Sequence, residues 1–194
     1  MNKIRLWLRN KIYCQPGNEI NISGRVRVRR CKISLKGHGC SLTLHPDVNL
    51  RGVNIEIDGI NCHINIGANT VVGENTYLSC RERDISLTIG DYCMFSRNVK
   101  VMTSDGHDII RSGERMNYAK NITIGNKVWL ADGVVVLKGG DIGDGCVIGI
   151  NSVVTNKVQG NTVAVGCPAR EVSKNVSWRK ELRKVRISGE ILLG

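Results

Sequence analysis

Residues 122–158 read ITIGNKVWLADGVVVLKGGDIGDGCVIGINSVVTNKV, and this stretch decides the fold. Aliphatic side chains recur in it every six residues without a gap, and a small residue usually follows each one. A helix face repeats near every 3.6 residues and a half-buried strand alternates every two, so neither alone explains the pattern. A strand of about four residues followed by a two-residue corner does explain it. The six aliphatic positions are Ile124, Leu130, Val136, Ile142, Ile148 and Val154.

Three such units close one triangular coil of about eighteen residues, with the aliphatic side chains inside and the coils stacked by parallel backbone hydrogen bonds. The sequence therefore predicts an all-β parallel β-helix. A β-sandwich of short strands is the alternative, and the unbroken register disfavours it. The same period recurs earlier in the chain, at Ile66 and Val72 and again at Ile89, Phe95 and Val101.

The segment 122–170, which ends V-G-C-P-A-R, resembles the C-terminal coils of the hexapeptide acyltransferases, and the block from Ile64 extends the likeness. This resemblance implies a left-handed β-helix and acetyl-CoA as the acyl donor. It is closest to the sugar and surface-polysaccharide O-acetyltransferases. It also implies a homotrimer with active sites between subunits.

Interruptions of the period divide the chain into three parts. We expect an amphipathic capping segment at 1–19, a β-helix acyltransferase domain at 20–172 and a basic helix or tail at 173–194. Apolar residues at helical spacing predict a short helix within residues 3–13, and residues 177–187 suggest a terminal helix or an extended tail. The first helix either caps the solenoid or contacts an anionic membrane. An extended loop is expected near 102–121, where the spacing between Val101 and Ile124 is too long for one coil.

Charge and composition exclude several classes of protein. The net charge of +11 lies at the two ends, with eight Lys/Arg and one acid in residues 1–30. Few aromatic residues and a neutral middle argue against nucleic-acid binding. An anionic glycan, cofactor or membrane fits the basic ends. Without a signal-peptide pattern or a long apolar run, we expect a cytoplasmic protein, peripheral at most to the inner face of the membrane.

The cysteines and histidines carry weaker signals. None of the eight cysteines forms a C-x-x-C pair, so we expect small buried hydrophobes in a reducing compartment. The histidines lack the spacing of a zinc site, so no metal is expected. Eighteen-residue coils throughout would stack two pairs of residues, Cys62 with Cys80 and His45 with His63.

His107 is the candidate general base. Acetyl transfer from a thioester to a hydroxyl needs a group that takes the hydroxyl proton, and an imidazole suits this near neutral pH. His107 lies in the interrupting loop between Asp105 and Asp108, either of which could orient it. In similar acetyltransferases, a loop histidine just before the I-G-N-x-V-W segment is the general base, and His107 matches that place. A solvated loop histidine is the alternative.

The resemblance also implies a donor site. Trp129 would stand on the outer face and form a wall near His107, or pack between subunits. Small and apolar residues would line the coenzyme groove, and Arg170 and Lys157 would contact phosphates. Relatives often carry a Lys directly after Thr155, whereas this chain has Asn156 first. The other expected donor contacts are Ala131, Gly149, Ile150 and Thr155.

The acceptor side departs from galactoside-type relatives, because residues 79–84 read SCRERD and the spacing differs. Arg81 and Arg83 could face an acidic sugar such as sialic acid, or be solvated. We therefore expect an acetyl-CoA-dependent O-acetyltransferase acting on a sugar hydroxyl of a surface polysaccharide. The alternatives are an N-acetyltransferase acting on an amino sugar and a non-catalytic β-helix scaffold.

Overall fold

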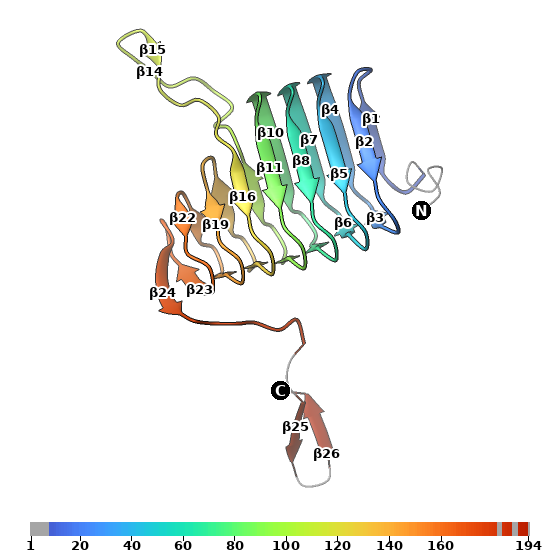
Figure 1. Ribbon diagram of the computed structural model, residues 1–194, viewed down its shortest axis with the longest axis vertical. Coiled ribbons are helices and arrows are strands. Elements are labelled where there is room, and N and C mark those ends of the chain that lie inside the picture. Colours follow the sequence, from blue (N-terminus) through green and yellow to red (C-terminus); the bar gives the residue numbers. More distant parts are fainter. Residues whose placement is uncertain (1–7, 182–183, 188–189, 194) are drawn as a thin grey trace.

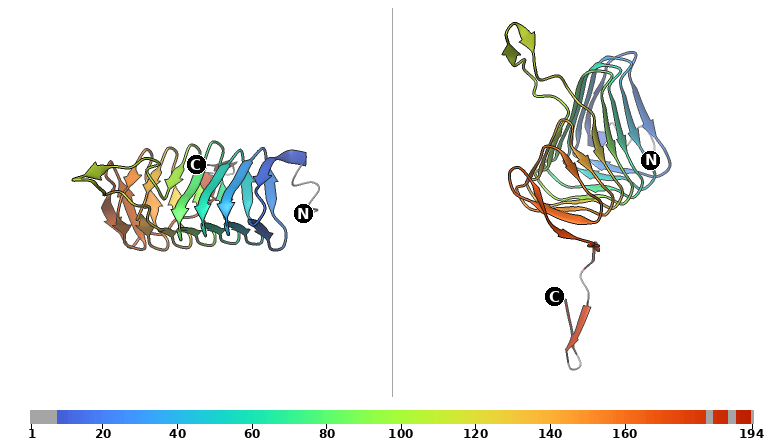
Figure 2. Two further views of the ribbon diagram at one scale, coloured as in Figure 1. Left: turned by 90° about the horizontal axis from the view of Figure 1, so that it is seen from above. Right: turned by 60° about the vertical axis from the view of Figure 1, so that its left-hand side comes forward.

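The computed structural model describes residues 8–181, 184–187 and 190–193, and the chain forms a three-sided solenoid (Figure 1). Each coil adds one strand to each of three parallel sheets, as the view along the solenoid in Figure 2 shows. The predicted left-handed parallel β-helix is confirmed.

Three sheets, here called sheets A, B and C, form the sides of the solenoid. Sheet A contains β1 (Lys11–Cys14), β4 (Lys32–His38), β7 (Asn54–Ile60), β10 (Tyr77–Arg83), β13 (Lys100–Met102), β18 (Val135–Leu137) and β21 (Val153–Val154). Sheet B contains β2 (Glu19–Ile22), β5 (Ser41–Leu44), β8 (His63–Ile66), β11 (Ser86–Ile89), β16 (Ile122–Ile124), β19 (Asp141–Ile142) and β22 (Lys157–Val158). Sheet C contains β3 (Arg27–Arg29), β6 (Asn49–Arg51), β9 (Val71–Val72), β12 (Met94–Phe95), β17 (Trp129–Leu130), β20 (Val147–Ile148), β23 (Thr162–Val165) and the antiparallel β24 (Arg170–Lys174).

Two hairpins stand outside these sheets: β14 (Ile110–Arg111) with β15 (Glu114–Arg115), and β25 (Lys184–Ile187) with β26 (Glu190–Leu193). The corners between sheets are called the A/B edge, the B/C edge and the C/A edge, in the order in which the chain turns through them. The outer surfaces of the sheets are faces A, B and C. The A/B edge lies opposite face C, since each edge of a three-sided solenoid faces the third side.

The aliphatic residues of the six-residue period fill the interior. Leu130, Val136 and Ile148 have no exposed surface, and Ile124, Ile142 and Val154 are 1% exposed. Each fully buried side chain of this kind contributes about 1.5–3 kcal/mol relative to an exposed one. Phe95 is among the largest fully buried side chains, and it lies in register with Val72 and Leu130 of the neighbouring coils.

The early coils are longer than the period predicts. In sheet A, Lys32 pairs with Asn54, 22 positions on, whereas Val135 pairs with Val153, 18 positions on. The expected stacking of His45 with His63 is therefore wrong, because His63 pairs with Ser41 and with Ser86. Cys80 likewise lies opposite Ile57, and Cys62 comes at the corner before β8, so Cys62 and Cys80 are not in register.

The extra residues of the early coils collect at the A/B edge. There β4, β7 and β10 have seven residues each, and they rise beyond the later strands as a ridge (Figure 1). The 103–121 loop leaves from the same edge, one coil further on, between β13 and β16. The A/B edge is thus the place where extra residues are inserted into the regular coil.

The terminal helices differ from expectation. The residues Lys11–Cys14 form β1, which pairs with β4, so the N-terminal helix does not extend over them; residues 1–7 lie outside the described residues. At the other end, where a helix or an extended tail was expected over 177–187, residues 184–187 form β25 and pair with β26 in an antiparallel hairpin. The first difference has a clear cause, because the open edge of sheet A offers backbone partners to an alternating segment. In the described part of the chain, no helix has the length and apolar character needed to cross a bilayer.

Candidate active site

The 103–121 loop closes on itself where it leaves the solenoid. The Lys120 N–H donates to the Thr103 carbonyl at 3.0 Å, and the Met116 N–H donates to the Ile109 carbonyl at 2.9 Å. Beyond these two contacts, β14 and β15 form a hairpin that projects away from the coils (Figures 1 and 2). The sequence expectation of an extended loop here is therefore matched, and the loop has a fixed base.

Asn117 ties the two arms of the loop together around His107. Its side chain is buried, and its Oδ1 accepts a hydrogen bond from the Ile109 N–H at 2.7 Å. Its Nδ2 donates to the His107 carbonyl and to Asp105 Oδ2, both at 2.8 Å. Asn117 therefore fixes the backbone at His107 and Ile109 and holds the Asp105 side chain, a role that the sequence alone did not reveal.

Glu82, at the end of β10, clamps the loop to the ridge. Its Oε1 accepts hydrogen bonds from Ser104 Oγ and Arg115 Nη2, each at 2.6 Å, and its Oε2 accepts one from the Ala119 N–H at 3.3 Å. Burial alone would raise the pKa of Glu82, but these hydrogen bonds outweigh it and hold the pKa below its ordinary value. The backbone of Glu82 has φ +86°, a left-handed conformation that a non-glycine residue keeps only when its surroundings enforce it.

Asp105 has partners other than the imidazole. Its Oδ2 accepts hydrogen bonds from Lys138 Nζ and Asn117 Nδ2, and the pKa of Asp105 is lowered chiefly by the Lys138 contact and then by Asn117. Lys138 also donates to the Asn117 carbonyl at 2.9 Å, so it links the loop to the next coil. Asp108 pairs with Arg115 Nε at 2.9 Å. Both acids thus position His107 indirectly, because their bonds to Lys138, Asn117 and Arg115 fix the conformation of the loop.

The His107 side chain is exposed at the head of this braced loop. Among the described residues, no hydrogen bond or ion pair is found for its imidazole. Its carbonyl is held by Asn117, so the backbone is fixed while the side chain is exposed. The arrangement suits a base that must meet an incoming hydroxyl.

Arg81 lies beside the same loop. Its backbone N–H donates to Thr103 Oγ1 at 3.1 Å, and a Cβ placed on Gly106 would lie 3.9 Å from Arg81 Nη1. Its Nη2 donates to Glu56 Oε1 at 2.8 Å, while its buried Nε has no partner among the described residues. Arg83 is exposed two residues on, at the end of β10. Of the two arginines named from the sequence, the structure brings Arg81 against the His107 loop.

Trp129 does not meet His107 within one chain. It lies on β17 of sheet C, whereas the loop leaves the A/B edge opposite that sheet. Its Nε1 donates to Ser96 Oγ at 3.2 Å, and its ring lies 6.0 Å from that of Trp178. Besides this ring contact, a hydrogen bond from Trp178 Nε1 to the Lys127 carbonyl at 2.6 Å holds the C-terminal segment against the solenoid. A role for Trp129 near His107 therefore requires a second copy of the chain.

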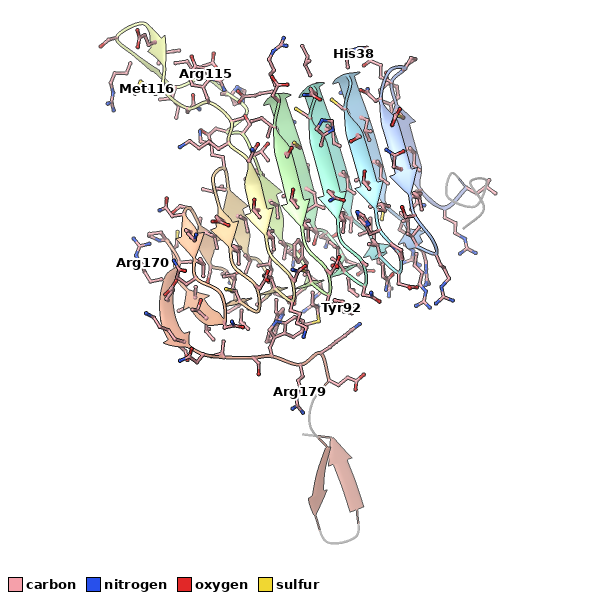
Figure 3. The ribbon with its side chains drawn as sticks, in the orientation of Figure 1. His38, Tyr92, Arg115, Met116, Arg170 and Arg179 are labelled. Atoms are coloured by element: carbon pink, nitrogen blue, oxygen red, sulfur yellow. The ribbon has the colours of Figure 1, made fainter. Side chains whose placement is uncertain are left out.

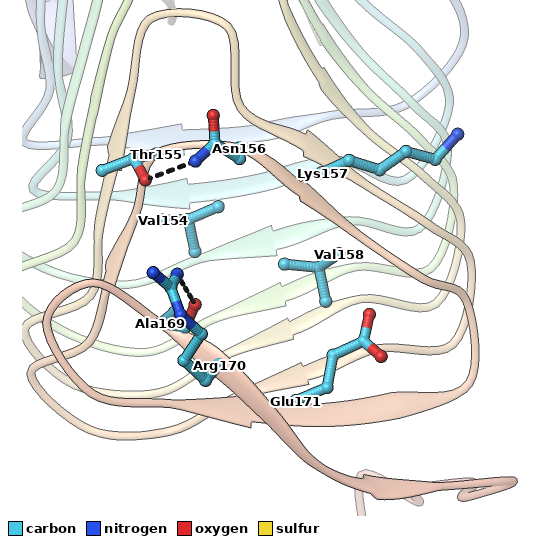
Figure 4. A pocket seen from close by; sticks show the side chains of 8 residues that line it. All are labelled: Val154, Thr155, Asn156, Lys157, Val158, Ala169, Arg170 and Glu171. Carbon is cyan, nitrogen blue, oxygen red and sulfur yellow. Dashed lines mark hydrogen bonds between the residues drawn. The ribbon is translucent and has the colours of Figure 1, made fainter.

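The residues named for the donor fall into two groups. Thr155, Lys157 and Arg170 line one groove of about 300 Å³ at the C-terminal end of the solenoid (Figure 4). Figure 3 shows Arg170 at that end and Arg115 on the projecting loop. The remaining three residues lie on or next to the C/A edge, away from this groove. They are Ala131, Gly149 and Ile150.

Two features of these two groups of residues are relevant to the binding of coenzyme A. A Cβ on Gly149 would lie 2.6 Å from Val165 Cγ1, so this position accepts only a glycine without movement of its neighbour. Lys157 is exposed and lies 3.6 Å from Asp141, and Arg170 bonds only to the neighbouring Ala169 carbonyl among the described contacts. Both cations are thus accessible to phosphate groups. Within the described residues, no group of three or more His, Cys, Asp or Glu side chains could hold a metal ion.

Curated proteins with similar sequences include galactoside and polysialic acid O-acetyltransferases. The chain is 35% identical over 116 residues to galactoside O-acetyltransferase of Escherichia coli K12, which spans 57% of this chain and 56% of that protein. It is 32% identical over 124 residues to polysialic acid O-acetyltransferase of Neisseria meningitidis, which spans 63% of this chain and 56% of that protein. The matches thus span about half the length of these relatives. No family model matches the chain.

Solved structures agree with the sequence matches. The polysialic acid O-acetyltransferase OatWY superposes with a TM-score of 0.78 and 27% identity, over 90% of this chain and 89% of that one. A hexapeptide-repeat acetyltransferase of Vibrio cholerae in complex with acetyl-CoA shares the fold, with a TM-score of 0.50 and 21% identity over 81% of this chain and 70% of that one. The chain is therefore similar to hexapeptide-repeat O-acetyltransferases in both sequence and fold.

Proposed function

We propose that this chain is an O-acetyltransferase that transfers the acetyl group of acetyl-CoA to a sugar hydroxyl of an acidic polysaccharide. The observation that carries the proposal is the braced 103–121 loop, which exposes the His107 side chain, without a bonded partner among the described residues, directly after Gly106, where Arg81 Nη1 approaches the loop. The similarity to galactoside and polysialic acid O-acetyltransferases supports the reaction class.

In this proposal His107 is the general base. One ring nitrogen takes the acceptor hydroxyl proton as the oxygen attacks the thioester carbonyl. The new C–O bond forms, the C–S bond breaks, and the imidazolium returns the proton to the departing thiolate. Such a base contributes a factor of about 10²–10⁴. No cysteine nucleophile is needed, which agrees with the burial of six of the eight cysteines.

Arg81 supports an acidic acceptor. Its guanidinium is half-buried next to Gly106, and only one of its groups is engaged by Glu56. Glu56 engages Nη2, so a carboxylate on the acceptor would form its charge-assisted hydrogen bond with Nη1. Arg83 would add a second, exposed positive charge on the same edge.

For the donor, we assign the phosphate groups to Lys157 and Arg170, with Thr155 in the same groove. A planar guanidinium and a flexible ammonium are the usual partners of phosphate oxygens. Ala131, Gly149 and Ile150 lie on a different edge, so a donor role for them depends on the surface of a neighbouring subunit.

We propose a homotrimer to supply that surface. The outward-facing residues of the later coils are apolar and half-buried on faces A and C, which meet at the C/A edge, where Ile150 is 66% exposed. With this edge of the late coils at a threefold axis, face A of one copy meets face C of the next there, and the cationic C/A edge of the early coils stays outside the contact. The loop of the first copy then approaches Trp129 of the second. The loop also exposes large apolar side chains for such a contact: Ile109, Ile110, Met116 and Tyr118.

The test is acetyl transfer from acetyl-CoA to a sialic acid polymer, with the product identified by mass spectrometry. We expect wild-type product with ester-linked acetyl groups and, for His107→Ala, a rate at least about 100-fold lower with unchanged circular dichroism. His38→Ala is the matched control, because His38 is an exposed histidine on the same ridge (Figure 3). Acetylation of amines alone, or of no glycan, would contradict the proposal.

A further inference from the structure

The first coils carry a groove lined by four cations at the C/A edge. Arg9, Lys11, Arg30 and Lys32 line it together with Leu8, Asn10 and Cys31, and its volume is about 370 Å³. Among the residues that the structure describes, no acidic side chain lines it. All four cationic side chains are exposed.

The backbone holds these cations in stacked pairs. Lys11 and Lys32 are direct partners on β1 and β4, and the Arg30 N–H donates to the Arg9 carbonyl at 3.0 Å. Neighbouring strands lie about 4.8 Å apart, and like charges directly opposite each other destabilise a sheet. The arrangement therefore has an electrostatic cost that an anionic ligand would relieve.

Neighbouring acids do not relieve it. Among the described residues, none of these four cations takes part in an ion pair, whereas Arg25 pairs with Asp47 and Arg51 with Glu74. The acids on the adjacent coils thus have partners of their own.

A second groove continues the first along the C/A edge into the next coils. It also contains Arg30 and Lys32, has a volume of about 440 Å³, and is otherwise lined by amide, hydroxyl and backbone groups up to Tyr77. Tyr77 begins β10, the strand whose other end carries Arg81 beside the His107 loop. The two grooves share Arg30 and Lys32, so they form one polar track along the C/A edge.

We infer that this track is a second binding site for an anionic polysaccharide, which holds an extended segment of the acceptor away from the reacting sugar. The inference rests on the proposed function in taking the acceptor polymer as the ligand. A polymer fits because the charges are spread over several coils, which one phosphate or one sugar could not span. Asparagine amides suit the hydroxyl groups that accompany the carboxylates of a glycan, and the Tyr77 hydroxyl, which donates to Glu56 Oε2 at 2.7 Å, can still accept a hydrogen bond from them.

The geometry favours a glycan over a membrane surface. An anionic bilayer contacts a flat face and gains from apolar side chains that enter it. Here the cations border grooves that run across the strands, and the continuation of the track is lined by polar groups. The ligand that follows such a track is a single extended chain.

The experiment measures binding of the full chain to sialic acid polymers and to sialic acid dimers, without acetyl-CoA, by isothermal titration calorimetry. The variant is Arg30→Glu with Lys32→Glu. The matched control is Lys174→Glu with Arg179→Glu, which changes the net charge equally at two exposed positions far along the chain. We expect the first variant to weaken polymer binding at least about tenfold, and the control less than about twofold. Thermal unfolding confirms that both variants fold.

Dimer binding and acetylation of the dimer should be the same in wild type and both variants, because the short ligand does not reach the first coils. Equal weakening by the two pairs would overturn the inference, since net charge alone would then explain it. So would wild-type binding to vesicles containing phosphatidylglycerol but not to the polymer. Polymer binding that depends on Arg30 and Lys32 in a chain that transfers no acetyl group would uphold this site and contradict the proposed function.

Discussion

The early coils and the late coils build the same three-sided solenoid in different ways. Late strands such as β18 and β21 follow an 18-residue spacing, while β4 and β7 are 22 residues apart. The outer surface differs as well, because faces A and C are cationic or polar in the early coils and apolar in the late ones. The interior is equally buried in both.

This difference in coil length distinguishes the residues that build the solenoid from those that form the candidate site. The interior requires only that aliphatic residues return to the inside, and both coil lengths satisfy that. The additional residues all enter at the A/B edge, where they make the ridge that carries Arg81 and Glu82. The 103–121 loop at the same edge is then clamped by Glu82 through Ser104 and Arg115.

The largest expected effect concerns the outer surfaces. Leu137 and Ser34 occupy equivalent outward positions of sheet A in a late and an early coil. Leu137→Lys places a charge in the proposed subunit contact, so we expect monomers and loss of acetyl transfer. Ser34→Lys should leave the trimer intact. Sedimentation velocity checks both, and a trimeric, active Leu137→Lys would show that the late face A is not an interface.

The next effect tests whether the interior is continuous across the change in coil length. Phe95 lies in the last coil before the loop and is 1% exposed. Phe95→Ala should lower the free energy of unfolding by about 3–5 kcal/mol, because it leaves a cavity between Val72 and Leu130. Lys36→Ala on the exposed ridge should change it by less than about 0.5 kcal/mol. Chemical denaturation measures both, and similar values for the two would refute the packing argument.

A smaller effect is expected from the clamp between ridge and loop. Glu82→Gln keeps the shape but weakens the charge-assisted bonds to Arg115 and Ser104. We expect kcat to fall about tenfold with little change in the KM for acetyl-CoA, since Glu82 positions the loop and does not contact the donor. Asp84→Asn, two residues on, is the control. A change in KM alone would assign Glu82 to donor binding.

The smallest effect is the pH response of the loop. The pKa values of Glu82 and Asp105 are both lowered in the folded chain. Their contribution to stability is thus complete above their unfolded pKa values, about 4, and is lost as the pH falls through the lowered folded values. Hydrogen exchange should show a closed loop at pH 7 and a more open one at pH 3. Opening of the loop between pH 7 and pH 5 would contradict the role of these carboxylates.

The fold could be predicted from the sequence because the aliphatic positions from Ile124 to Val154 repeat without interruption, and each repeat is one strand and one corner. The stacking of Cys62 on Cys80 was predicted wrongly, because extra residues in a coil leave the interior pattern intact while shifting the register. The N-terminal helix was also predicted too long, because β1 pairs with the open edge of sheet A despite the helical spacing of its apolar residues.

Only some residues of the candidate site could be predicted from the sequence. His107 and Arg81 could be named because their residue types suit the chemistry, and Thr155, Lys157 and Arg170 do share one groove. Glu82 and Lys138 were missed, since contacts across 21 to 37 positions arise only when the long loop folds back on the ridge. Asn117 was missed as well, because its contacts across 8 to 12 positions depend on how the loop folds on itself. The positive φ of Glu82 is likewise invisible in the sequence.

The most direct test of the account is chemical rescue of His107→Ala. The variant should transfer acetyl groups to a sialic acid polymer at least about 100-fold more slowly than the wild type, and added imidazole should restore part of the rate in proportion to its concentration. A folded, trimeric His107→Ala with near wild-type turnover, or a loss that imidazole leaves unchanged, would contradict the claim that the loop imidazole takes the acceptor proton.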